Sequence, residues 1–210
     1  MVRTIAMTRV LTLLTSNHVQ VHADASNFAD GITKDDAYEH VLMQAEGLFT
    51  DQRNWQSRQR RGLVVARLQI LAFPEQGSKL GRREAAFVTR DAGFYVLDPS
   101  SRKPRLILGP FQGKVACQTI EFGRGVCGAA AATQKTQLIA DVDQFPGHIA
   151  CDGDSKSEIV VPILADTDGS GVKKVVAIID VDCTVENGFD DLDRKYLGDL
   201  ADLLGKSCDW

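Results

Sequence analysis

Three of the five cysteines in this chain stand at positions where a thiol could react. Cys127 lies near the start of a predicted short helix over 126–133, where the helix dipole favours the thiolate and lowers the thiol pKa. Cys151 follows a loop signature at 145–148, and Cys117 opens a predicted strand. A thiolate can act as a nucleophile, so each of the three is a candidate reactive residue. A buried, inert thiol is the commoner fate of a single cysteine, and that alternative stays open.

Three carboxylates form a second candidate group. Glu158 precedes the apolar run 159–161, and Asp180 and Asp182 lie two residues apart near the end of another apolar run. Because side chains alternate along a strand, Asp180 and Asp182 are expected on the same face. Burying two carboxylates is costly unless a cation meets them. The pair therefore either faces water at a strand end, or grips an ammonium group or holds one carboxyl protonated as an acid.

The composition excludes several classes of protein. With 210 residues, 44% hydrophobic and 25% charged, the chain is typical of one soluble globular domain. A formal net charge of -4 provides no basic face for nucleic acid or an anionic membrane, and no apolar run reaches the roughly 18 residues of a membrane span. The odd cysteine count argues against a secreted disulfide scaffold. The lack of a CxxC pair and the presence of only four histidines predict no metal site.

The predicted helices and strands place these residues on a mixed fold. The predicted elements are helices 35–51, 126–133 and 190–204, and strands 93–97, 106–108, 117–122, 159–164 and 175–181. Thr33 and Asp36 resemble a capping box before the first helix. Gly109 and Pro110 are expected to close the second strand. Strands framed by N- and C-terminal helices indicate an α/β (α+β) sandwich.

Residues 1–21 are interpreted as an N-terminal extension without structure. The segment carries Arg3 and Arg9, a short apolar stretch and no acidic residue before Asp24. A signal peptide or a mitochondrial presequence is the alternative, but the apolar core is short and no A-x-A site follows it. We therefore expect a cytoplasmic protein, with mitochondrial or secreted as the weaker alternative.

Long stretches of the chain resemble a known family. The run from Leu108 to Ile163, with CQTIEFGRGVCGAAAAT and DVDQFPGHIACDGDSKSEIVVPI, closely resembles the free methionine-(R)-sulfoxide reductases, a catalytic branch of the GAF fold. The resemblance extends through IIDVD and LDRKYLGDLADLL, and on the other side takes in Val21 to Trp55. It implies a single GAF-like domain over 22–210, with a central antiparallel sheet flanked by the N- and C-terminal helices.

The resemblance also implies an activity. It implies thiol-dependent reduction of free L-methionine (R)-S-oxide to L-methionine through a cysteine sulfenic acid and an intramolecular disulfide. Thioredoxin would recycle the enzyme as external reductant, no cofactor would be bound, and a homodimer remains open. By position, the implied roles are Cys151 as nucleophile, Cys117 as resolving cysteine, Cys127 as auxiliary or alternative resolving cysteine, Glu158, Asp180 and Asp182 as substrate-binding residues, and Cys183 and Cys208 as structural residues.

The resemblance stops over residues 56–91. When Gln56 to Leu80 is reverse-translated and read one nucleotide forward, permitted codons give NLANAAASLWHAYKSLPSPSKAVNW, which resembles the family helix and linker. We therefore interpret 56–91 as an anomalous segment, frameshifted or mis-spliced, with the frame restored before Ala92. Asp91 then stands where the family has a tryptophan that helps to wall the pocket around the sulfoxide methyl group.

Two other readings compete with the enzyme. The chain could be a non-catalytic GAF module that binds a small ligand or senses oxidants, or an inactive product of a faulty gene model. Cys151 discriminates between the first alternative and the enzyme, because a ligand-binding module has no need of a nucleophile there.

Overall fold

A single curved sheet organises the part of the chain that the computed structural model describes, which is residues 33–49, 91–114, 116–151 and 153–210. Its six strands follow the order β3-β2-β1-β6-β5-β4, and every neighbouring pair is antiparallel. The strands are β1 (Ala92–Leu97), β2 (Arg105–Gln112), β3 (Thr119–Glu121), β4 (Gln137–Ile139), β5 (Ser157–Ala165) and β6 (Lys174–Cys183). The expected α+β fold with a central antiparallel sheet is confirmed.

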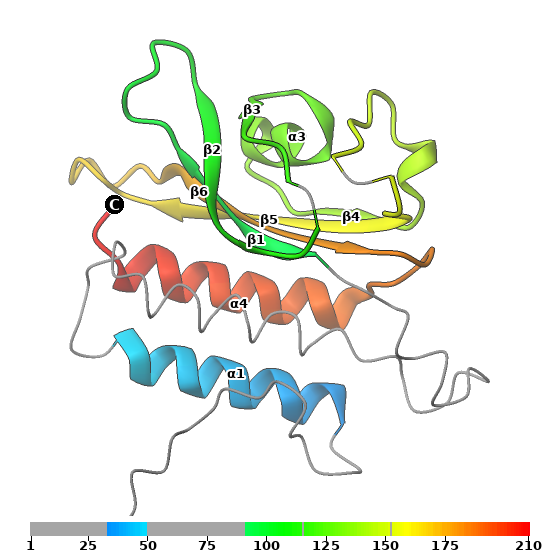
Figure 1. Ribbon diagram of the computed structural model, residues 1–210. Coiled ribbons are helices and arrows are strands. Elements are labelled where there is room, and N and C mark those ends of the chain that lie inside the picture. Colours follow the sequence, from blue (N-terminus) through cyan, green and yellow to red (C-terminus); the bar gives the residue numbers. More distant parts are fainter. Residues whose placement is uncertain (1–32, 50–90, 115, 152) are drawn as a thin grey trace, which may run out of the picture.

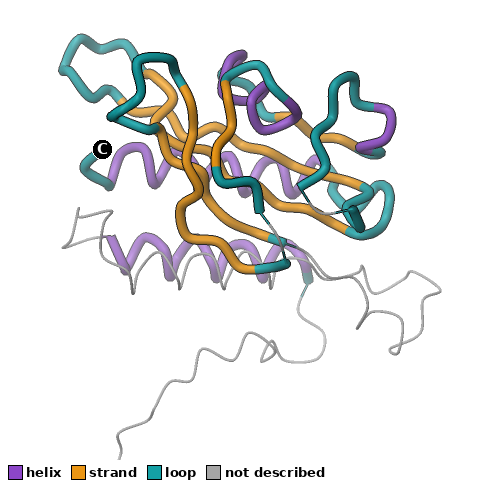
Figure 2. Tube along the Cα trace, turned by 45° about the horizontal axis from the view of Figure 1, so that its top comes forward, coloured by secondary structure: helices purple, strands orange, loops and turns teal. Residues whose placement is uncertain are grey.

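Two long helices lie on one side of the sheet. Helix α4 (Asp191–Ser207) lies against β5 and β6, and α1 (Lys34–Phe49) packs on the outer side of α4 (Figure 1). The view in Figure 2 places both helices on the same side of the strands. The predicted capping box of α1 is present, since the backbone N–H of Asp36 donates to Thr33 and that of Thr33 donates to the Asp36 carboxylate. Among the described residues, no helix has both the length and the apolar character needed to cross a membrane.

The other face of the sheet carries helix α3 (Gly125–Thr133), the short 3-10 helix η2 (Val142–Gln144) and their loops. Alternation along the two central strands divides the side chains between the faces. Ile159 on β5 and Ile179 on β6 belong to the core beneath the long helices, whereas Val160 and Ile178 belong to the core beneath α3. Asp180 and Asp182 share the parity of Ile178, so both point to the α3 face.

Two strand predictions need correction, and one strand was not predicted. Strand β2 does not stop at Gly109 and Pro110 but continues to Gln112. The register of β1 against β2 shifts between Gly93 and Tyr95, so that Gly109 and Pro110 occupy an irregular stretch beyond the β3 pairing, where a proline can be tolerated. Strand β3 covers only three of the six predicted residues, and β4 has no counterpart among the predicted strands. A three-residue strand is too short to show a period-two pattern.

Candidate active site

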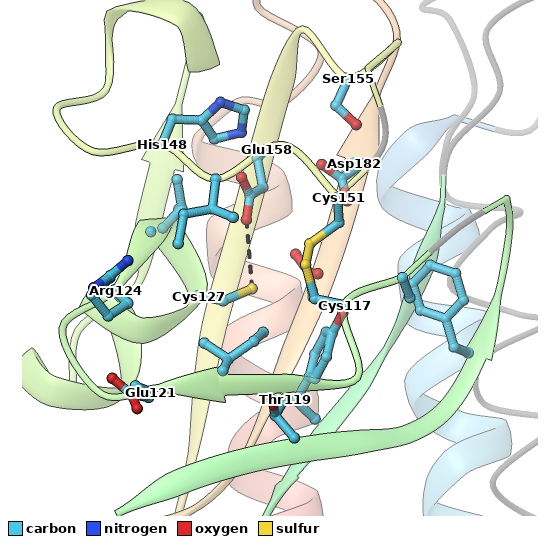
Figure 3. Close-up of a pocket in the computed structure, with 18 residues that line it drawn as sticks. Cys117, Thr119, Glu121, Arg124, Cys127, His148, Cys151, Ser155, Glu158 and Asp182 are labelled. Carbon is cyan, nitrogen blue, oxygen red and sulfur yellow. Dashed lines mark hydrogen bonds between the residues drawn. A yellow bond between two sulfur atoms is a disulfide. The ribbon is translucent and has the colours of Figure 1, made fainter.

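A pocket of about 400 Å3 opens on the α3 face of the sheet. All six residues that the sequence singled out line it, namely Cys117, Cys127, Cys151, Glu158, Asp180 and Asp182. They come from the loop before β3, from α3, from the loop after η2, and from β5 and β6 (Figure 3). Segments far apart in the sequence therefore bring thiols and carboxyls into one cavity.

A disulfide joins Cys117 to Cys151, with their Cα atoms 5.4 Å apart. Each cysteine belongs to a loop, and both are half-buried at the pocket. An exposed ion pair between Lys114 and Asp154 links the same two loops. The two cysteines thus stand close enough to exchange between the dithiol and disulfide states with little backbone movement.

Cys127 has a different environment from the disulfide pair. It lies in the first turn of α3, is 8% exposed and remains a free thiol. Its Sγ donates to Oε1 of Glu158 over 3.6 Å (Figure 3). Burial, followed by the charges of Asp180 and Glu158, raises the pKa of this thiol well above its usual range. The expectation that the helix dipole lowers the pKa of Cys127 is therefore wrong, because desolvation and nearby acids outweigh the dipole.

The three carboxyls form one acidic wall. Glu158 on β5 pairs with Asp182 on β6, and Asp180 follows on the same face. Glu158 and Asp180 are only 6% and 5% exposed, so the alternative of a pair facing water does not hold for Asp180. Burial raises the pKa of Glu158 well above its usual range, with the charges of Asp180 and Asp182 adding to it. Burial also raises the pKa of Asp180, to about 6, against opposing contacts from Cys127 and Glu158.

Two carboxyls of this wall receive no cation from the described residues. Within those ranges, no lysine, arginine or histidine forms an ion pair with Glu158 or Asp180. Oδ1 of Asp180 is also buried without a hydrogen-bond partner in the described part of the chain. A pair of buried carboxyls of this kind can hold one carboxyl protonated as an acid while the other is ionised and receives a cation.

The sequence patterns did not identify several other residues of the pocket. Tyr95, Phe111, Ile120 and Ile149 give the cavity its aromatic and aliphatic surface, and Ser155 adds a buried hydroxyl. Burial raises the pKa of Tyr95, with the charge of Asp180 adding to it, so its hydroxyl stays neutral. Tyr95 pairs with Ile178 of β6 and lies with it in the core beneath α3, but the sequence alone did not show which face of β1 meets the pocket. The remaining polar lining residues are Thr119, Glu121, Arg124 and His148.

Asp91 does not line the pocket, although the resemblance places a wall residue at this position. Its carboxylate is 6% exposed and accepts the backbone N–H of Lys114 over 3.2 Å, on the loop that leads to Cys117. Phe111 supplies an aromatic ring to the wall instead. Cys183 and Cys208 are buried, form no disulfide and lie outside the lining. The N-terminal extension 1–21 and the anomalous residues 56–90 lie outside the described part of the chain.

Comparison with known proteins agrees with this geometry. The GAF domain family matches residues 82–207. The free methionine-R-sulfoxide reductase of Saccharomyces cerevisiae is 45% identical over 89% of this chain and 94% of its own length. A solved GAF domain superposes with a TM-score of 0.75 at 42% identity, covering 92% of this chain and 99% of the other. A free methionine-R-sulfoxide reductase from Neisseria meningitidis, solved with its substrate, gives a TM-score of 0.67 at 35% identity, covering 86% and 93%. This chain belongs to the free methionine-R-sulfoxide reductase family of GAF-domain proteins.

Proposed function

We propose that this chain reduces free L-methionine (R)-S-oxide to L-methionine. The observation that carries the proposal is the Cys117–Cys151 pair, joined as a disulfide at the mouth of a pocket whose inner wall is acidic. Reduction of a sulfoxide needs two thiols and a proton donor, and all of these line the same cavity.

In the first half of the reaction, Cys151 acts as the nucleophile. Its thiolate attacks the sulfoxide sulfur, which becomes electrophilic as its oxygen is protonated. Glu158 supports this step, because burial raises its pKa and so favours the protonated carboxyl, which can donate a proton in the pocket. The oxygen passes from the substrate to Cys151, which becomes a sulfenic acid, and methionine leaves. Cys151 is oxidised by two electrons while the sulfoxide sulfur is reduced by two.

In the second half, Cys117 resolves the sulfenic acid. Its thiolate attacks the sulfur of Cys151, the disulfide forms, and the sulfenic oxygen departs as water. The Cα–Cα separation of 5.4 Å supports Cys117 in this role, since it lies in the range of an unstrained disulfide. Cys127 is buried and bonded to Glu158, which supports an auxiliary role rather than resolution.

The acidic wall selects the free amino acid. The ammonium group of free methionine sulfoxide brings a cation to the face that Asp180 and Asp182 share. A methionine sulfoxide within a peptide has no charged amine at that position and leaves the buried carboxylate of Asp180 without this interaction. The apolar surface around Phe111 and Ile149 suits the methyl group and the side-chain methylenes.

The disulfide must be reduced before the next turnover. Both of its cysteines are half-buried and lie in loops, which leaves them accessible to an external dithiol. Thioredoxin is the external reductant that the family resemblance implies. We expect this chain to bind no cofactor of its own.

The test is turnover of free methionine-(R)-sulfoxide by this full chain with a thioredoxin recycling system. We expect wild type and Cys208→Ser to release methionine, and Cys151→Ser to release none. The (S) epimer and N-acetylated (R) substrate serve as specificity controls, and both are expected to react poorly. Turnover that survives Cys151→Ser overturns the assignment of the nucleophile. A folded wild type that binds methionine sulfoxide without converting it supports the non-catalytic GAF module instead.

A further inference from the structure

The sulfur of Cys127 and the carboxylates of Glu158 and Asp180 form a compact group of ligand atoms. One oxygen or sulfur from each lies within 4.8 Å of the others, and all three residues are buried. They come from α3, β5 and β6, so the group is held by the packing of the helix on the sheet rather than by a flexible loop. Sequence spacing could not predict it, because the ligands are far apart along the chain.

A second observation points to a ligand at this position. Among the described residues, Oδ1 of Asp180 has no hydrogen-bond partner, although it is buried and its residue lines the open pocket. Within the same part of the chain, neither Glu158 nor Asp180 has an ion-pair partner. A buried carboxylate oxygen without a donor is costly, so a cation that reaches it gains the interaction that the protein leaves unmade.

The donor set selects the kind of cation. One thiol and two carboxylates favour a borderline-soft divalent metal over Mg2+ or Ca2+, which prefer oxygen ligands alone. Three protein ligands with the fourth direction open to a cavity of about 400 Å3 is the arrangement of an open zinc site. The separation of 3.6 Å between the sulfur of Cys127 and Oε1 of Glu158 suits two ligands of one ion.

We propose that Cys127, Glu158 and Asp180 form a reversible Zn2+ site that excludes the substrate ammonium. On binding, Cys127 and Glu158 ligate the metal in their deprotonated forms, and the protons that they held pass to solvent, with no change of oxidation state. The metal occupies Asp180, one of the two aspartates proposed to receive the ammonium, so Zn2+ competes with methionine sulfoxide. The binding stands independently of the proposed function, whereas the inhibition rests on it.

The binding test uses the full chain with its Cys117–Cys151 disulfide formed, so that the nucleophile cannot ligate the metal. Co2+ is the spectroscopic probe, because a cobalt thiolate in tetrahedral geometry gives a sulfur charge-transfer band and intense visible bands. We expect both signals in wild type and their loss on addition of Zn2+. Cys127→Ser should lose the charge-transfer band, whereas Cys183→Ser, which removes a buried thiol outside the pocket, should keep it. Asp180→Asn should weaken the affinity for Co2+ at least tenfold.

Each outcome decides the proposal. Absence of the bands in wild type overturns it, as does a band that survives Cys127→Ser. If Cys127→Ser fails to fold, Asp180→Asn keeps the test open, since it is isosteric, and unchanged metal affinity in that variant overturns the site. In the reduced enzyme, Zn2+ should raise the KM for methionine sulfoxide without changing kcat, and a chelator should reverse the effect. A cobalt thiolate spectrum from a chain without reductase activity would retain the metal site and reject the proposed function.

Discussion

The thiol of Cys127 donates to Oε1 of Glu158 over 3.6 Å, and both side chains are almost fully buried. The contact ties the first turn of α3 to the edge of the acidic wall. Cys127 therefore differs from the other two pocket cysteines, which are joined to each other in a disulfide. The three thiols are thus divided into a redox pair and a buried partner of a carboxyl.

This division predicts the behaviour of Cys117→Ser. The variant retains Cys151, so it should release up to one equivalent of methionine and then stop, because the sulfenic acid cannot be resolved. A dione reagent specific for sulfenic acids should label Cys151, as detected by mass spectrometry. Cys208→Ser is the matched control and should turn over like wild type. Sustained turnover by Cys117→Ser would show that another thiol resolves Cys151.

The acidic wall predicts opposite effects of Asp180→Asn on activity and stability. Loss of the carboxylate should raise the KM for methionine sulfoxide at least thirtyfold, since breaking a buried charge pair costs about 2–5 kcal/mol. The same change replaces a buried carboxylate oxygen that no described residue partners, so the melting temperature should rise. Steady-state kinetics and thermal unfolding at pH 7.5 measure both effects. A variant that is destabilised, with an unchanged KM, would contradict the role of Asp180 in binding the ammonium.

Much of this site could be predicted from sequence because strands have a fixed period. Asp180 and Asp182 share a parity, so their common face followed from the sequence alone. The N- and C-terminal helices were also predicted, but the face of the sheet on which they lie was not. The pKa of Cys127 could not be predicted in this way. It depends on Glu158 and Asp180, which reach the thiol only through the packing of α3 on the sheet. The course of β2 through Pro110 also depends on tertiary pairing, because an irregular register accommodates the missing N–H.

The contact between Asp91 and the Cys117 loop predicts a kinetic effect on resolution. Asp91→Ala removes the acceptor for the backbone N–H of Lys114, a hydrogen bond worth about 0.5–1.5 kcal/mol. Disulfide formation should therefore slow about three- to tenfold, whereas methionine release in the first half should keep its rate. Rapid-quench measurement of methionine and of free thiols separates the two steps.

Two comparison variants make the Asp91 prediction specific. Asp91→Asn keeps an acceptor oxygen and should restore the rate of disulfide formation. Lys114→Ala removes the exposed ion pair with Asp154, and exposed pairs contribute little, so its effect should be smaller. Equal slowing of both half-reactions in Asp91→Ala would mean that Asp91 supports the pocket as a whole rather than the Cys117 loop.

The turn between β1 and β2 predicts a stability effect that depends on pH. Hydrogen bonds from Ser100 and Arg105 lower the pKa of Asp98 to about 2, below the ordinary value of 3.8. The folded pKa is the lower one, so the stabilisation is complete above the unfolded pKa and is lost as pH falls from about 4 to about 2. Asp98→Asn should lower the melting temperature at pH 7, and the difference from wild type should shrink towards pH 2. A difference that stays constant with pH would show that the charge of Asp98 does not stabilise the turn.

Alanine substitutions at two helical glycines are predicted to have opposite effects on stability. Gly128 lies where α3 closely approaches β3 and the loop that follows it, whereas Gly198 lies in α4. A Cβ on Gly128 would lie 2.3 Å from the carbonyl oxygen of Glu121 and 3.2 Å from the backbone nitrogen of Gly123, and backbone atoms cannot move aside cheaply. Gly128→Ala should therefore destabilise the fold by about 1–3 kcal/mol, and it should displace Cys127 in the adjacent position. A Cβ on Gly198 in α4 would meet no heavy atom of a neighbouring element within 4 Å, so Gly198→Ala should stabilise the fold by about 0.5–1 kcal/mol. Urea unfolding measures both changes. Equal effects of the two substitutions would mean that α3 is free to move away from β3. Cys127, whose thiol bonds to Glu158, would then move with the helix.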